Sequence, residues 1–127
     1  MREIRALIVD DSSVMRKIIE RSLRQAGLTE LVVHEAGSGT DGLEVLKTKE
    51  VDLILSDINM PAMDGLEFLR QIRVQSLAPG VPVVMITTES SEEHVKQAIQ
   101  AGAQGYIRKP FTPDQVKERV LSLVKVA

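Results

Sequence analysis

Five short, mostly apolar runs alternate along the chain with segments whose apolar residues recur at helical spacing. The runs cover about residues 4–9, 31–36, 51–56, 81–86 and 105–108. Most are continuous aliphatic stretches, a pattern that is typical of strands buried on both faces of a parallel sheet. Because parallel strands must be joined by a crossover, usually a helix, the alternation predicts an α/β fold. We expect a three-layer, doubly wound (βα)5 domain that occupies residues 1–127.

Capping residues and apolar spacing mark the expected helices. Ser12 or Ser13 can cap the first helix, and Thr112 with Gln115 has the spacing of a capping box for the last one. Ser90 and Glu93 have the same spacing before the fourth helix. The apolar residues at helical spacing include Val14, Ile18, Ile19 and Leu23 in the first helix and the inward-facing Val95, Ala98 and Ile99 in the fourth.

The composition argues against several classes of function. A net charge of −2 does not suit a general nucleic-acid binder, which needs clustered lysine and arginine. The chain has no cysteine, so disulfides, thiolate catalysis and cysteine-ligated metals are excluded. No apolar run approaches membrane-spanning length, and no signal-peptide region follows Met1. We therefore expect a cytoplasmic protein without a membrane or nucleic-acid partner.

Charged or hydroxyl side chains mark the ends of four of the five apolar runs. Asp10 and Asp11 follow the first run, Asp57 follows the third, Thr87 follows the fourth, and Lys109 follows the fifth. Each residue by itself could serve only in capping or turn formation. Because the carboxyl ends of parallel strands line one crevice, we expect these side chains to converge there. Carboxylates suit Mg²⁺, and an ammonium suits phosphate oxygens, so the pattern predicts a metal-assisted phosphate site.

Together these residues resemble the receiver domain of two-component response regulators, and most of all its single-domain, CheY-like members. The segments that carry the resemblance are Asp10-Asp11, Asp57-Ile58-Asn59-Met60-Pro61-Ala62-Met63-Asp64-Gly65, Thr87 and Lys109-Pro110-Phe111. They occur in the family's order, and the resemblance covers the whole chain. It implies a flavodoxin-like fold whose five-stranded parallel sheet has the order 2-1-3-4-5.

The resemblance also implies a phosphoacceptor function for Asp57. A histidine kinase would donate the phosphoryl group, with Mg²⁺ held by Asp10, Asp11, Asp57 and the backbone carbonyl of Asn59. Carboxylates form covalent intermediates of this kind, and a metal offsets the repulsion between the anions that meet. Such a protein is a regulator and not an enzyme with other substrates, because it catalyses only its own phosphorylation and dephosphorylation.

Lys109 and Thr87 are implied to bind phosphoryl oxygens, and Thr87 and Tyr106 are implied to act as the switch. Phosphorylation would draw Thr87 inward and change the face formed by helix 4, strand 5 and helix 5, where a target protein binds. Chemotaxis is one pathway that the resemblance suggests. We expect a monomer that could dimerise on phosphorylation. In the family, the bond equivalent to Lys109-Pro110 is usually cis.

Two other functions use a similar fold or chemistry. An aspartyl-phosphate phosphohydrolase of the haloacid dehalogenase type would carry a second aspartate two residues after the nucleophile, where this chain has Asn59. A constitutive interaction module would not need the acid pair, Asp57, Thr87 and Lys109. By resemblance, Thr88 affects access to the phosphoryl group, while Asn59 and Glu89 affect its lifetime.

Overall fold

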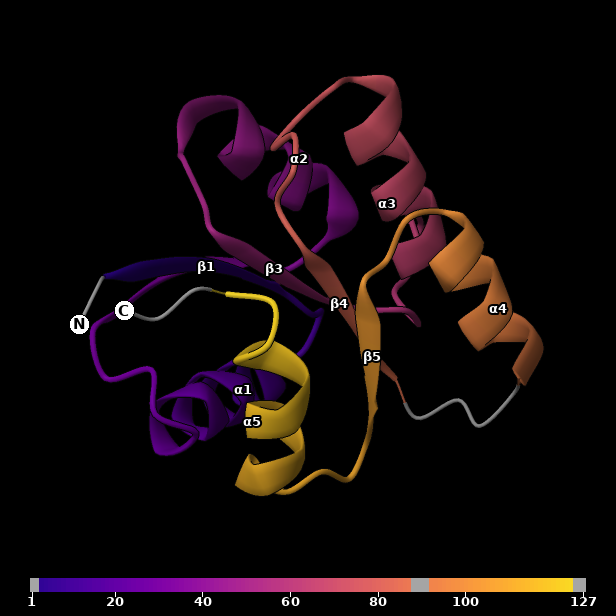
Figure 1. Cartoon of the computed structure of the whole chain (residues 1–127). Coiled ribbons are helices and arrows are strands. Elements are labelled where there is room, and N and C mark those ends of the chain that lie inside the picture. The colour runs from indigo at the N-terminus through magenta and orange to yellow at the C-terminus, as the bar shows by residue number, and fades with distance from the viewer. Residues whose placement is uncertain (1–2, 88–91, 125–127) are drawn as a thin grey trace.

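The computed structural model describes residues 3–87 and 92–124, and in this part of the chain five strands alternate with five helices (Figure 1). The strands are β1 (Ile4–Val9), β2 (Leu31–Ala36), β3 (Leu53–Asp57), β4 (Val83–Thr87) and β5 (Gly105–Arg108). The helices are α1 (Ser13–Gln25), α2 (Gly39–Thr48), α3 (Gly65–Val74), α4 (Glu92–Gln100) and α5 (Pro113–Val120).

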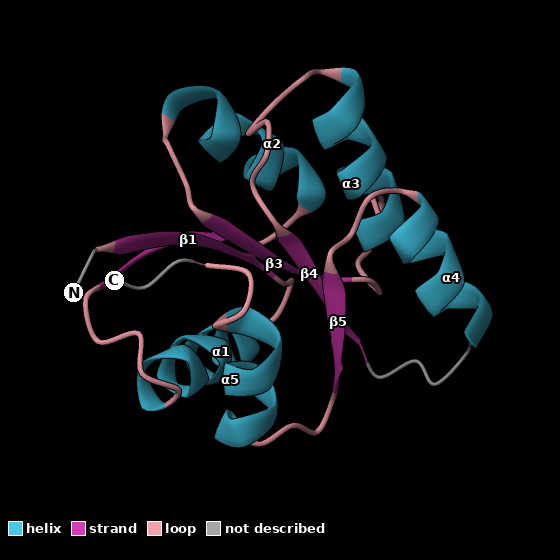
Figure 2. Ribbon diagram, viewed as in Figure 1, coloured by secondary structure: helices cyan, strands magenta, loops and turns pink. Residues whose placement is uncertain are grey.

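All neighbouring strands are parallel, and their order in the sheet is β2-β1-β3-β4-β5. This confirms both the fold class that the alternation predicts and the strand order that the resemblance implies. Helices α1 and α5 cover one face of the sheet, while α2, α3 and α4 cover the other (Figure 2). The direction in which successive strands are added reverses at β1, because β2 lies on one side of β1 and β3 lies on the other. This reversal is the topological switch point of the sheet.

Two apolar cores form on the two faces of the sheet. Leu7 and Val9 of β1 pack toward α2 and α3, while Ala6 and Ile8 pack toward α1 and α5. Because successive side chains of a strand point to opposite faces, a strand that is covered on both sides must be apolar throughout. This explains the continuous apolar runs of the sequence.

Side-chain caps begin several of the helices as the sequence predicts. The Ser12 hydroxyl accepts a hydrogen bond from the amide of Met15 and so caps α1. Thr112 and Gln115 form the complete capping box of α5. The box expected for α4 depends on Ser90, which lies outside the described residues. Within the described residues, no helix is both long and apolar enough to cross a membrane.

The structure corrects the predicted side chains of α4 and the bounds of two strands. Ile99, expected to face inward, is 56% exposed, because Ala98 occupies the centre of the buried stripe and the next residue turns about 100° away from it. Val14 and Ile18 of α1 are also exposed. Strands β3 and β4 begin and end later than predicted, so Asp57 and Thr87 are the last residues of their strands.

Candidate functional site

The carboxyl ends of four strands bring the predicted site residues to one edge of the sheet. Asp57 ends β3 and Thr87 ends β4, while Asp10 directly follows β1 and Lys109 directly follows β5. Asp10 is 1% exposed, Asp57 is 7% exposed and Thr87 is fully buried. Polar side chains rarely lie this deep without a partner or a function. The carboxyl end of the sheet is therefore a chemically distinctive part of the molecule.

Lys109 lies between two of the buried carboxylates. Its Nζ is 3.2 Å from Oδ2 of Asp10, to which it donates a hydrogen bond, and 3.6 Å from Oδ2 of Asp57. Its backbone amide donates to the carbonyl oxygen of Thr87 at 2.8 Å, which holds the residue beside β4. The next peptide bond, Lys109-Pro110, is cis. One ammonium thus bridges carboxylates that lie far apart in the sequence.

The carboxylates of Asp10, Asp11 and Asp57 form a compact set of oxygen donors. One oxygen of each lies within 4.8 Å of the others, with Asp11 exposed at the mouth of the crevice. Lys109 is the ammonium in contact with this group, so the carboxylates exceed it by two negative charges when all are ionised. Mg²⁺ takes oxygen ligands, commonly from one or two carboxylates, and this donor set fits a divalent cation of that kind.

Burial raises the pKa of Asp57, because the ionised form loses its hydration. The charge of Lys109 opposes this increase, while the charge of Asp10 adds to it. Hydrogen bonds from the amides of Asn59, at 3.3 Å to Oδ1, and Ile58 lower the pKa again, but less than burial raises it. Asp57 is therefore held in an environment that resists its negative charge unless another cation is present.

The loop between Asp57 and α3 is closely fitted to the end of β3. A Cβ atom on Gly65 would overlap the carbonyl oxygen of Asp57 and the side chain of Met85. The amide of Gly65 donates to the carbonyl of Ile58 at 2.8 Å, and Ala62 adopts a positive φ of 67°. The sequence shows the Asp64-Gly65 pair as a turn signal, but only the structure shows that glycine is needed for close approach to Asp57.

Arg16 is a second residue whose contact with the site is not evident from the sequence. Its NH1 group donates to the backbone carbonyl of Asp10 at 2.6 Å. The only signal in the sequence is a cation close to the start of a helix, where the helix dipole disfavours positive charge.

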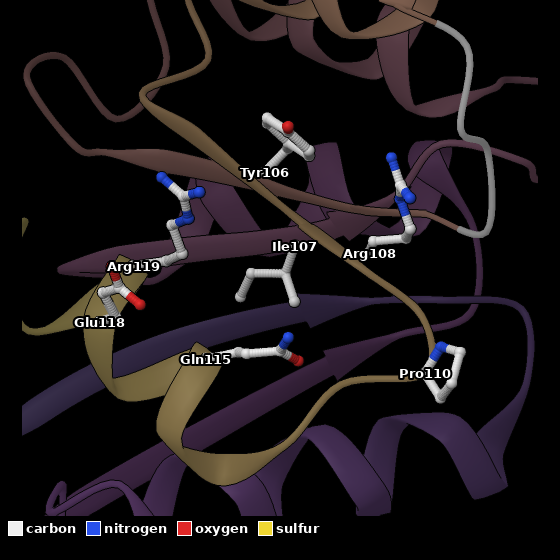
Figure 3. A pocket seen from close by; sticks show the side chains of 7 residues that line it. All are labelled: Tyr106, Ile107, Arg108, Pro110, Gln115, Glu118 and Arg119. Atoms are coloured by element: carbon white, nitrogen blue, oxygen red, sulfur yellow. The ribbon is translucent and has the colours of Figure 1, made fainter.

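Tyr106 lies on β5, away from the acidic crevice, beside a cavity of about 310 Å³ between β5 and α5 (Figure 3). The guanidinium of Arg119 lies 5.7 Å from the centre of its half-buried ring. The other residues that line the cavity are Ile107, Arg108, Pro110, Gln115 and Glu118. Thr88 and Glu89 lie outside the described residues.

Comparison with known proteins points to one family. The family model of the response regulator receiver domain matches residues 6–121. The chemotaxis protein CheY of Pseudomonas aeruginosa is 40% identical over 117 residues, which are 92% of this chain and 93% of that protein. CheY-3 of Vibrio cholerae is 40% identical over 119 residues, or 94% of this chain and 90% of that protein.

Solved structures agree with the sequence comparisons. The structure of the chemotaxis protein CheY4 of Vibrio cholerae matches with a TM-score of 0.86 at 33% identity, over 97% of this chain and 100% of that one. The resemblance seen in the sequence is thus confirmed over nearly the whole length. With its parallel sheet in the order β2-β1-β3-β4-β5, the chain belongs to the response regulator receiver domain family and is homologous to the CheY proteins.

Proposed function

We propose that this chain is a phosphorylation-activated switch of a two-component system, and that Asp57 accepts the phosphoryl group from a histidine kinase. The observation that carries the proposal is the position of the Lys109 ammonium, 3.2 Å from Asp10 and 3.6 Å from Asp57. A carboxylate that attacks a phosphoryl group must meet another anion, and this lysine offsets that repulsion. Phosphoryl transfer depends chiefly on such positioning and charge neutralisation.

In the proposed reaction, a carboxylate oxygen of Asp57 attacks phosphorus and forms an O–P bond while the N–P bond of the phosphohistidine breaks. The electron pair of the broken bond stays on the imidazole nitrogen. Lys109 stabilises one phosphoryl oxygen by charge, and the Thr87 hydroxyl donates a hydrogen bond to another. Asp10, Asp11, Asp57 and the backbone carbonyl of Asn59 would hold Mg²⁺. When bound, this ion neutralises charge between the phosphoryl group and the carboxylates.

Phosphorylation replaces the single negative charge of the ionised Asp57 carboxylate with a phosphoryl group that carries about 1.5 to 2 negative charges at the end of β3. We expect Thr87 to move toward the new oxygens, because it ends the adjacent strand, where Ile86 pairs with Asp57. Thr87 in turn pairs with Arg108 of β5, two residues after Tyr106. This register supports a route through β4 from the proposed phosphorylation site to the part of β5 that carries Tyr106.

The face formed by α4, β5 and α5 is the surface on which we expect a target protein to bind. The cavity beside Tyr106 is a recess in this face, with Arg108 on β5 and Arg119 on α5 along its lining (Figure 3). A role in chemotaxis is supported by the CheY relatives. We expect residues 1–127 to act as one cytoplasmic receiver, monomeric before phosphorylation, that catalyses only its own phosphorylation and hydrolysis.

The competing functions have less support from the site. A phosphohydrolase of the haloacid dehalogenase type needs a carboxylic acid two residues after its nucleophile, and the amide of Asn59 cannot transfer protons in that way. A constitutive interaction module has no need of two buried aspartates around one lysine. Keeping such charges buried opposes folding, so their presence is better explained by a function that uses them.

The experiment is intact-protein mass spectrometry after incubation with acetyl phosphate, with and without Mg²⁺. We expect one phosphoryl adduct on the unmodified chain that requires Mg²⁺ and is absent from Asp57→Asn. Asp64→Asn is the matched control, because Asp64 caps α3 outside the crevice and asparagine caps a helix equally well. An adduct that persists in Asp57→Asn, or none on the unmodified chain although Mg²⁺ binds, would contradict the proposal.

A further inference from the structure

Arg16 connects the acidic pair to the neighbouring strand β2. Its side chain is largely buried and makes two charge-assisted hydrogen bonds. NH1 donates to the backbone carbonyl of Asp10 at 2.6 Å, and Nε donates to Oε1 of Glu35 at 3.0 Å. The carbonyl of Asp10 belongs to the peptide unit that joins Asp10 to Asp11. Arg16 therefore holds the covalent link between the two carboxylates.

The backbone of Asp10 is fixed from both ends. Its amide donates to the carbonyl of Ala36 at 3.1 Å, which extends the pairing of β1 with β2 by one residue. Its carbonyl is held through Arg16 by Glu35, a residue of β2 that pairs with Ile8. The orientation of the peptide after Asp10 thus depends on a side-chain bridge and not only on the sheet.

Glu35 is a stable anchor for this bridge because it remains ionised. A hydrogen bond from Lys17 is the main cause that lowers the pKa of Glu35; burial opposes the shift, and Arg16 adds to it. Lys17 Nζ lies 2.8 Å from the other carboxylate oxygen, Oε2. In the described structure, Lys17 donates a hydrogen bond to Glu35 but none to Asp10, whereas Arg16 donates one to each of these residues. The two neighbouring cations are therefore a natural matched pair.

The position of Arg16 is unfavourable for the helix that carries it. Arg16 and Lys17 lie near the amino end of α1, and the first turn of this helix contains no acidic residue. The helix dipole favours anions at this end and disfavours cations. A residue that opposes a local preference commonly does so because it makes a contact elsewhere. Here that contact is with the backbone carbonyl of Asp10.

We infer that Arg16, anchored by Glu35, is a positioning residue that sets the spacing of the Asp10 and Asp11 carboxylates and so raises the affinity of the crevice for a divalent cation. The inference rests on the proposed function. It is distinct from a simple effect of charge. A cation near a Mg²⁺ site repels the ion, so charge alone predicts tighter Mg²⁺ binding when Arg16 is neutralised. Positioning predicts weaker binding.

The test is calorimetric titration of Mg²⁺ into the unphosphorylated protein and into Arg16→Gln and Lys17→Gln, which remove the same charge. For Arg16→Gln we expect the Kd for Mg²⁺ to rise about tenfold, as is typical when an outer contact of a metal ligand is lost. For Lys17→Gln we expect a change of no more than about twofold. Arg16→Lys keeps the charge with a single donor group and should recover part of the affinity.

Phosphorylation by acetyl phosphate supplies a second measurement. Arg16→Gln should need about ten times more Mg²⁺ for half-maximal rate, yet reach nearly the normal rate at saturating Mg²⁺. Thermal unfolding without Mg²⁺ checks that each variant folds. If Arg16→Gln does not fold, Glu35→Gln replaces it, since an amide oxygen still accepts from Arg16 more weakly, and a smaller rise in Kd is expected.

An unchanged or lower Kd in Arg16→Gln, or an equal rise in Lys17→Gln, would overturn the inference. An unchanged Kd in Glu35→Gln would do so if that variant has to be used. Failure of the proposed function looks different. The unmodified protein would then bind Mg²⁺ but take up no phosphoryl group, and the Mg²⁺ titrations would still decide the role of Arg16.

Discussion

The two ends of the sheet both carry clusters of charge, but they are built in opposite ways. At the amino end, Arg5 forms ion pairs with Asp52 at 3.4 Å and with Glu50 at 3.1 Å, and the backbone amide of Arg5 also donates to Asp52. At the carboxyl end, the ammonium of Lys109 contacts Asp10 and Asp57, and the carboxylate of Asp11 lies close to these two carboxylates. The first cluster is half-buried or exposed, and its two carboxylates exceed the guanidinium by one negative charge.

This difference separates a stabilising cluster from a functional one. Paired surface charges can lower the free energy of the fold slightly without any ligand. Crowded and buried carboxylates oppose folding, and they are useful only when a cation or a reaction partner relieves the repulsion.

The largest effect is expected from Gly65→Ala at the carboxyl end. A methyl group there overlaps the carbonyl oxygen of Asp57, so the backbone of the site must shift. We expect the free energy of unfolding to fall by about 3 kcal/mol in urea denaturation. Gly105→Ala is the control at the amino end of β5, where the added methyl meets no atom within 4 Å. A similar loss in both variants would show that the crevice is no more tightly built than the opposite end.

The second prediction is an opposite change in stability at the two ends. Without Mg²⁺, Asp57→Asn should raise the free energy of unfolding, because it removes a buried charge that lies near Asp10. Asp52→Asn should lower it by about 1 kcal/mol, because the charge-assisted hydrogen bond from the amide of Arg5 is weakened. Urea denaturation of both variants checks the signs, and two changes of the same sign would remove the contrast.

The third prediction concerns pH and follows from the raised pKa of Asp57. In the folded state this carboxyl binds a proton more tightly than its ordinary value of 3.8 implies. Folding is therefore more favourable at low pH, where the Asp57 carboxyl is protonated, than at a higher pH, where it is ionised. This contribution to stability is lost as pH rises from the ordinary pKa through the raised one. The stability difference between Asp57→Asn and the unmodified chain should grow over this interval.

Denaturation curves at a series of pH values test this dependence in the absence of divalent ions. Adding Mg²⁺ should reduce the difference above the raised pKa, because the ion stabilises the ionised carboxylates. A difference that is constant with pH would mean that the burial of Asp57 does not disfavour its charge.

The smallest effect is expected from Glu50→Gln at the amino end. Its carboxylate is exposed and pairs only with Arg5 in the described structure. Exposed pairs of this kind contribute little and are screened by salt. We expect a change in unfolding midpoint close to the error of measurement at low ionic strength and none at high ionic strength. A large, salt-resistant loss would show that the amino-end cluster is more than a surface ion pair.

The sequence predicts the layers and the approximate extent of the strands and helices, because apolar runs and caps are local signals. It does not predict the exposure of Ile99, since the width of a buried stripe depends on how the helix is tilted over the sheet. The order of the strands follows from the resemblance and not from any pattern of spacing.

The parts of the site that local signals miss depend on proximity in three dimensions. Arg16 and Glu35 meet only because β1 and β2 pair in a register that places Glu35 opposite Ile8. The requirement for glycine at Gly65 arises from the path of the chain after Asp57. The residue types at these three positions do not by themselves predict such contacts. The residues that carry charge at strand ends are visible in the sequence, whereas those that hold them in place are not.

The strand order has one consequence for the proposed switch. It places β3, with Asp57, at the centre of the sheet and β5, with Tyr106, at the edge, with only β4 between them. Two interstrand spacings amount to roughly 10 Å. If phosphorylation and target binding are coupled over this path, the coupling is reciprocal. If a phosphoryl group on Asp57 raises the affinity of the β5 edge for a target by some factor, the bound target must favour phosphorylation of Asp57 by the same factor.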